Sequence, residues 1–318
     1  MSDAVTDAEH LFPLDNLLKC DYFVKYRKGY YKARDLNLLN PYRNYVELLT
    51  SLSEIYAYNE RHARSFAKRI TANASDFGQC EAVFAEIIVY RHYVRPVHED
   101  LVRRVELHES EADVIVERPD GSRMFLEVFS VNPDFPIAKR GEKPIVKDVR
   151  THTQNAMASI RQKLLRKIKR QKQMSAPREN YAVIELNNPS IAGDFSVLSS
   201  LSGGYKVQLD RRTLRPVSSG YDWGESIFND PATRFLKGII YFSLGDYSSR
   251  KYLLNPETRR TDQAPLGERF DMDQFLHEAR PRIFDPDGNV TASEGFDVDD
   301  FVRTIHEGRG VERKDLSD

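Results

Sequence analysis

Two acidic residues, Asp113 and Glu127, lie in segments whose pattern predicts neighbouring strands. Residues 112–118 (ADVIVER) and 123–131 (RMFLEVFSV) alternate in polarity and are rich in valine and phenylalanine, which is typical of β-strands. The turn sequence RPDGS separates them; its Pro119 presets the first turn position, and Gly121 supplies a left-handed residue. A β-hairpin with one carboxylate on each strand is therefore predicted.

The type of turn decides whether the two carboxylates face one another. A three-residue loop with a G1 bulge pairs Glu117 with Arg123 and, in the same register, Asp113 with Glu127. A two-residue loop would shift the pairing by one residue, send the carboxylates to opposite faces and set two arginines against each other. We favour the three-residue loop because it opposes unlike charges.

Opposed carboxylates need a positive charge between them. Directly paired residues have Cβ atoms about 4.5–5.5 Å apart, a distance at which two negative charges are destabilising. Mg²⁺ takes carboxylate and water oxygens and often needs only one or two protein carboxylates. The pair therefore predicts a site for Mg²⁺ or Mn²⁺, and the alternative is that one or both side chains turn into solvent.

The rest of the sequence predicts the elements that would position this pair. The expected fold class is α/β, with a mixed central sheet flanked by helices and an N-terminal helical region. We assign residues 1–77 to the helical region, 78–260 to the core and 261–318 to a C-terminal extension, whose last 25 residues or so form a weakly ordered acidic tail. The predicted elements are helices at 14–26, 44–70, 78–92 and about 151–173, a buried strand at 181–188, and a strand pair at 238–244 and 250–255.

The ordered set of motifs resembles the PD-(D/E)XK nuclease superfamily. That pattern is an Asp at the start of one strand and Glu-x-Lys on the next, preceded by a helix with a Glu and followed by a helix–strand crossover. Residues 78–186 follow this order, with Glu86 (or Glu81) in the helix, Asp113 in SEADVIV and Glu127 in FLEVFSV. The resemblance implies a restriction-endonuclease-like core.

The same resemblance implies a set of metal ligands. Asp113 and Glu127 would hold Mg²⁺ or Mn²⁺, and the backbone carbonyl near Val128 would complete the shell. Glu86 would orient a metal-bound water or a second ion.

Two positions depart from the motif. Ala112 replaces the Pro, and Phe129 stands where the motif has its Lys. In several branches of the superfamily the following helix supplies this Lys, and here that helix offers Lys163 and Lys167 near its core-facing stripe. One of the two is expected to stabilise charge that develops on the phosphate. The alternative is a core that has lost catalysis.

The acidic residues of the third helix have different surroundings. Glu86 lies among apolar residues of a helix that is apolar on most of its circumference, and an unpaired carboxylate buried there would be costly. We expect a metal, the catalytic carboxylates, or a neighbouring Arg or Tyr to satisfy it. Glu81 lies on another stripe and is expected to be exposed.

The helix after the hairpin is strongly basic. Seven Lys and Arg residues lie between positions 161 and 172, with no acidic residue among them. Along a phosphate backbone such a helix would give salt-dependent, sequence-independent binding; the alternative is a solvated face. The residues expected to contact nucleic acid are Arg161, Arg166, Lys169, Arg170 and Gln171.

Composition excludes several other classes of protein. The net charge of -1 argues against a uniformly basic nucleic-acid binder. Cys20 and Cys80 form no CxxC motif, and no apolar run approaches the ~20 residues that span a bilayer. The first twelve residues are acidic where a signal peptide would be basic. We therefore expect a cytoplasmic protein without membrane contact. The sequence also contains no P-loop, GxGxxG, GxSxG or HExxH motif.

These patterns favour a metal-dependent nuclease that hydrolyses phosphodiester bonds in DNA or RNA. The alternative is a catalytically inactive module of the same fold that binds nucleic acid or a protein partner, and association into a homo-oligomer remains open. A glycosidase ranks far below, because the residues around the hairpin are aliphatic and basic rather than aromatic.

Overall fold

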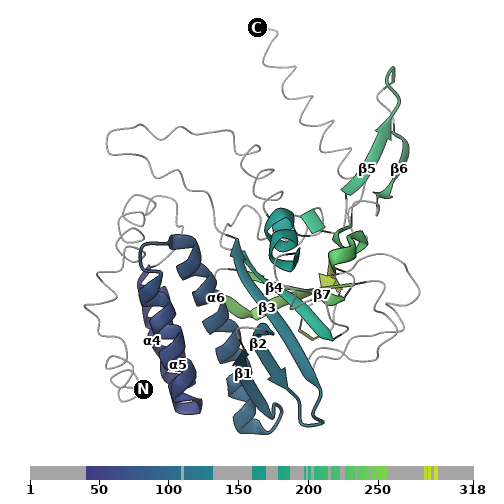
Figure 1. The fold of residues 1–318 in the computed structure, drawn as a ribbon. Coiled ribbons are helices and arrows are strands. Elements are labelled where there is room, and N and C mark those ends of the chain that lie inside the picture. Colours follow the sequence, from purple (N-terminus) through teal and green to yellow (C-terminus); the bar gives the residue numbers. More distant parts are fainter. Residues whose placement is uncertain are drawn as a thin grey trace, which may run out of the picture.

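A computed structural model gives the arrangement of the elements (Figure 1). It describes residues 41–108, 111–131, 160–169, 178–186, 197, 200–201, 204–213, 216–222, 226–233, 235–243, 245–255, 283–284, 286–287 and 290–292. Within these ranges the chain has an α/β fold with a mixed sheet and helices, as predicted. The expected helix at 14–26, most residues of the expected C-terminal extension and the acidic tail lie outside the described residues.

Three helices precede the sheet. They are α4 (Pro41–Tyr58), α5 (Glu60–Ala72) and α6 (Phe77–Val94), and a short 3₁₀ segment, η2 (Arg95–Glu99), follows them. The prediction of one helix over 44–70 was wrong, because Asn59 interrupts it with extended backbone (φ -154°, ψ 100°). Its side chain accepts a hydrogen bond from the backbone N–H of His62 and so begins α5 as an N-cap. The third helix was predicted correctly.

The main sheet has the order β1-β2-β3-β4-β7-β8-β9-β10. Parallel pairing occurs between β3 and β4 and between β4 and β7, and the other neighbours are antiparallel. This confirms the mixed sheet. Six strands are long and two are short: β1 (Arg104–His108), β2 (Ala112–Glu117), β3 (Arg123–Val131), β4 (Glu179–Leu186), β7 (Leu236–Ser243), β8 (Asp246–Leu254), β9 (Ile283–Phe284) and β10 (Val290–Ala292).

Three parts of the strand pattern differ from the prediction or extend it. β8 begins several residues earlier than expected, so its turn from β7 is shorter. β1 was not predicted. A separate two-stranded sheet of β5 (Gly204–Leu209) and β6 (Pro216–Asp222) was also missed, and Figure 1 shows this hairpin projecting from the main sheet.

The hairpin register was predicted correctly. Glu117 pairs with Arg123, and Ile115 pairs with Phe125. The N–H of Arg118 donates to the carbonyl of Ser122 at 2.9 Å, which closes a three-residue loop. Gly121 has φ +83° there, a conformation that costs glycine little. Because side chains alternate between the faces of a strand, this register places Asp113 and Glu127 on one face.

Apolar clusters lie on both faces of the sheet. Alternate residues of β3, such as Leu126 and Val128, pack with α4, α5 and α6. Phe129 and Val131 belong to a second cluster that includes Ile160, Leu164 and Ile168 of the helical segment 160–169. Helices therefore cover both faces. No helix within the described ranges is long and apolar enough to cross a membrane.

Candidate functional site

Three oxygen atoms surround the ammonium group of Lys167. Its Nζ lies 2.7 Å from Oδ2 of Asp113 and 3.0 Å from Oε1 of Glu127, and it also donates to the backbone carbonyl of Val128. The backbone N–H of Val128 donates to Oδ2 of Asp113 at 2.8 Å, which fixes that carboxylate against β3. The two acidic residues and the carbonyl expected to bind a metal therefore converge on one cation.

Packing of the helical segment 160–169 brings Lys167 to the hairpin. Leu164 and Ile168 are buried against the face of β3 that carries Phe129. The Nζ of Lys167 lies 6.0 Å from the centre of the Phe129 ring. Phe129 therefore forms part of the wall beside a lysine that comes from the helix. Of the two candidate lysines, Lys167 is the one for which the structure shows a contact with the carboxylates.

Glu127 is the most deeply buried member of this group. Its side chain is 1% exposed, and neither carboxylate oxygen has a hydrogen-bond partner of good geometry among the described residues, although Oε1 forms the ion pair with Lys167. The pKa of Glu127 is raised to about 7, because burial and the charge of Asp113 raise it more than Lys167 lowers it. Burial alone would lower the pKa of Lys167, but Asp113 and Glu127 outweigh it and raise that pKa.

Glu86 is satisfied by an arginine of the neighbouring helix. Arg69 of α5 donates from Nη1 and Nη2 to the two oxygens of Glu86 at 2.5 and 2.7 Å. The pKa of Glu86 is raised to about 7, because burial and the charge of Asp113 raise it more than Arg69 and Lys167 lower it. Of the alternatives left open by the sequence, the structure therefore shows the neighbouring arginine.

Two expectations about helix α6 can be compared directly. Glu86 is buried as expected, with 3% of its surface exposed. The expectation that Glu81 is exposed was wrong, because it is also 3% exposed. The cause is the packing of α4, α5 and the sheet around α6, which leaves little of that helix open to solvent.

The basic helix meets acidic residues as well as solvent. Lys169 forms an ion pair of 2.9 Å with Asp230, which follows the 3₁₀ segment η6 (Ile227–Asn229). Arg166 is exposed, and Arg161 is partly buried. The remaining expected contacts, Arg170 and Gln171, lie outside the described residues.

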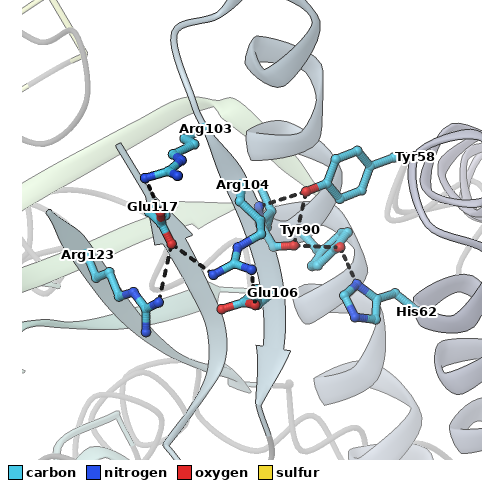
Figure 2. Close-up of polar contacts among 9 residues, drawn as sticks. Tyr58, His62, Tyr90, Arg103, Arg104, Glu106, Glu117 and Arg123 are labelled. Atoms are coloured by element: carbon cyan, nitrogen blue, oxygen red, sulfur yellow. Dashed lines mark hydrogen bonds and ion pairs between the residues drawn. The ribbon is translucent and has the colours of Figure 1, made fainter. Parts of the chain in front are cut away.

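Sequence reasoning missed the charged residues beside this site. Arg69 lies 17 positions before Glu86, and no motif links them. A second group, Arg103, Arg104 and Arg123, gathers around Glu117 at the turn end of the hairpin (Figure 2). Only the Glu117–Arg123 pair could be predicted, from the hairpin register.

The donor set is compatible with a hard divalent cation. Two carboxylates and a carbonyl supply oxygen ligands of the type that Mg²⁺ and Mn²⁺ prefer, and water or phosphate oxygens usually fill the remaining positions. The buried Glu127 oxygens without hydrogen bonds fit such an ion. Within the described part of the chain, no group of three or more His, Cys, Asp or Glu side chains could hold a metal ion.

Comparison with known proteins adds no relative to this picture. No protein-family model matches the chain, and neither a curated protein nor a solved structure matches it.

Proposed function

We propose that the chain is a metal-dependent nuclease that hydrolyses phosphodiester bonds, with Asp113, Glu127 and Lys167 at its centre. The observation that carries the proposal is the convergence of two carboxylates and the Val128 carbonyl on one cation. Buried groups of this kind are costly unless they are paired. Acidic groups with strongly shifted pKa values also cluster at functional sites.

Each residue has a specific task in this proposal. Mg²⁺ or Mn²⁺ held by Asp113, Glu127 and the Val128 carbonyl would supply electrostatic stabilisation of the phosphate. Lys167 would then donate its hydrogen bonds to phosphate oxygens, where negative charge develops in the transition state. Hydrolysis forms a bond from a water oxygen to phosphorus and breaks a bond from phosphorus to one ester oxygen. Glu86, held by Arg69, would keep its carboxylate fixed beside Asp113 and Lys167.

The position of Lys167 also favours a second candidate function. An ammonium already neutralises part of the charge of Asp113 and Glu127, so the fold needs no metal to hold the two strands together. In a catalytically inactive module that binds nucleic acid or a protein partner, Lys167 would stay paired with the two carboxylates and no metal would replace it. A measurement of metal binding distinguishes the nuclease from the inactive module.

A cleavage assay tests the proposal directly. Labelled single- and double-stranded DNA and RNA are incubated with the protein in Mg²⁺, in Mn²⁺ and in EDTA. The nuclease proposal expects product with metal, none with EDTA, and none from Asp113→Asn or Lys167→Met. Glu60→Gln is the matched control, because Glu60 is an exposed acid on α5 paired with Arg64, and it should cleave like the unmodified protein. Absence of cleavage on all four substrates would favour the inactive module.

A further inference from the structure

Three arginines gather around one carboxylate at the turn end of the hairpin. Glu117 lies 3.1 Å from Arg103, 3.0 Å from Arg104 and 3.3 Å from Arg123 in nitrogen–oxygen distance. Figure 2 shows the guanidinium groups of these three residues around the Glu117 carboxylate. Arg104 pairs with Glu117 across β1 and β2, and Arg123 pairs with it across β2 and β3.

The charges in this cluster do not balance. Glu117 supplies one negative charge, and Glu106 supplies another to Arg104 at 3.2 Å, so one of the three positive charges has no acidic counterpart in the cluster. Each guanidinium carries five N–H donors, and these ion pairs use only one or two of them per arginine.

The exposure of the cluster argues against a purely structural role. The side chain of Glu117 is 8% exposed, whereas those of Arg103, Arg104 and Arg123 are 64%, 50% and 44% exposed. Ion pairs with exposed partners contribute little to stability, and three like charges brought together repel one another. A buried carboxylate that holds three exposed guanidinium groups does, however, preorganise them for an anion and lowers the entropy lost on binding.

The cluster lies on the same face of the hairpin as the candidate site. Asp113 and Glu117 are four residues apart in β2, and residues at even spacing share a face of a strand. At about 3.3 Å per residue they are separated by roughly 13 Å along the strand. A nucleic-acid strand carries one phosphate per nucleotide along its backbone, so a strand with its reacting phosphate at Asp113 can reach this cluster within a few nucleotides.

Another cation lies beside the intervening row of side chains. Between the two positions are Ile115 and Phe125, and the Arg178 guanidinium lies 4.9 Å from the centre of the Phe125 ring. Arg178 also forms an ion pair with Glu111 at 2.9 Å. Positive groups therefore occur at the turn end, beside the middle row and at Lys167.

We propose that Arg103, Arg104 and Arg123 form a phosphate-binding subsite for a nucleic-acid strand whose reacting phosphate lies at Asp113 and Glu127. This inference rests on the proposed nuclease function, which it extends by identifying where the flanking backbone binds. Arginine forks bind phosphate oxygens through paired N–H donors. Recognition of this kind positions the strand without reading its sequence.

Fluorescence anisotropy of a labelled single-stranded oligonucleotide tests the subsite. Measurements are made in EDTA over a range of salt concentrations, so that binding is followed without metal-dependent cleavage. The double variant Arg103→Gln/Arg123→Gln keeps the pairing of Arg104 with Glu117. It should bind about tenfold more weakly, and the slope of log K against log salt should fall by roughly 0.7 for each lost contact.

Two further variants separate specific contacts from net charge. Arg61→Gln/Arg64→Gln makes the same change in charge at exposed positions of α5 and should keep the slope of the unmodified protein. Arg103→Lys/Arg123→Lys should keep the slope but bind less tightly than the unmodified protein, because lysine retains the charge and loses the paired donors. The affinities are compared only among variants whose melting temperatures match that of the unmodified protein.

Equal effects of the Arg103/Arg123 and Arg61/Arg64 glutamine variants would overturn the subsite. That result together with metal-dependent cleavage by the unmodified protein would leave the nuclease proposal intact. A selective loss of affinity at Arg103 and Arg123 without any cleavage would support the phosphate subsite and reject the nuclease function.

Discussion

Lys167 donates from its ammonium group to Oδ2 of Asp113 at 2.7 Å. The contact joins the helical segment 160–169 to the second strand of the sheet and uses an oxygen that a metal ion would also need. A divalent cation bound at these carboxylates would therefore compete with Lys167 for the same ligands. This competition makes the roles of the lysine and of the carboxylates separable by experiment.

Lys167→Met should bind Mn²⁺ more tightly than the unmodified protein while losing cleavage. The variant removes the ammonium that occupies the carboxylate oxygens, so less energy is spent on displacing it, but the charge on the phosphate is no longer stabilised. Isothermal titration with Mn²⁺ measures the affinity. Lys163→Met, one turn earlier in the same helix, is the control and should leave Mn²⁺ affinity unchanged. Weaker Mn²⁺ binding by Lys167→Met would contradict the competition.

Asp113→Asn and Glu127→Gln should leave the metal-free protein within about 1 kcal/mol of its original stability, the scale of a cross-strand pair. Two carboxylates share one ammonium, so neutralising either one leaves a balanced pair. Added Mg²⁺ or Mn²⁺ should raise the melting temperature of the unmodified protein by mass action and that of the variants much less.

Thermal unfolding of these three proteins with and without metal provides the measurement. If both substitutions destabilise the protein strongly and metal shifts no melting curve, the carboxylates are structural. The inactive-module function would then replace the nuclease proposal.

Arg69→Met should destabilise the protein by about 3–5 kcal/mol at pH 8, because it leaves the Glu86 carboxylate buried without its ionic partner. The Glu86 side chain is only 4% exposed. Denaturant unfolding gives the free energy, and Arg64→Met, which breaks an exposed pair with Glu60, should cost less than about 1 kcal/mol. The double variant Arg69→Met/Glu86→Leu should recover much of the loss, and failure to recover would show that Arg69 acts through other contacts.

His92 should make stability fall in acid. Burial, together with the charges of Arg250 and Arg95, lowers the pKa of His92 to about 3. The unfolded chain takes up the proton near pH 6.5, so this contribution to stability is present above pH 6.5 and is lost as the pH falls toward 3. The ring packs edge-on against Tyr93 and Tyr247, with centroids 5.1 and 4.8 Å apart.

Comparison with His92→Gln isolates this effect. At pH 8 the variant should be less stable, because the aromatic contacts are lost. The difference in free energy of unfolding between the two proteins should shrink as the pH falls from 6.5 to 4. Only the unmodified protein loses stability through protonation of residue 92, because glutamine does not titrate. A difference that stays constant over this range would show that His92 is not held neutral by the fold.

The local sequence determined the hairpin and the relation of its two carboxylates. Pro119 and Gly121 select a three-residue loop, and the loop fixes which residues oppose one another on strands that continue from it. Because side chains alternate strictly along a strand, that register also sets the shared face of Asp113 and Glu127. The mixed sheet followed from the order of strands and helices in the same way.

Only the tertiary structure decided which partners complete the site. Lys163 and Lys167 both lie near the core-facing stripe of one helix, and the way that helix packs on Phe129 brings Lys167 to the carboxylates. Arg69 reaches Glu86 because α5 and α6 pack together after the helix break at Asn59. Contacts of this kind depend on the positions of whole helices, which are set by apolar packing across the molecule and not by the spacing of residues in one segment.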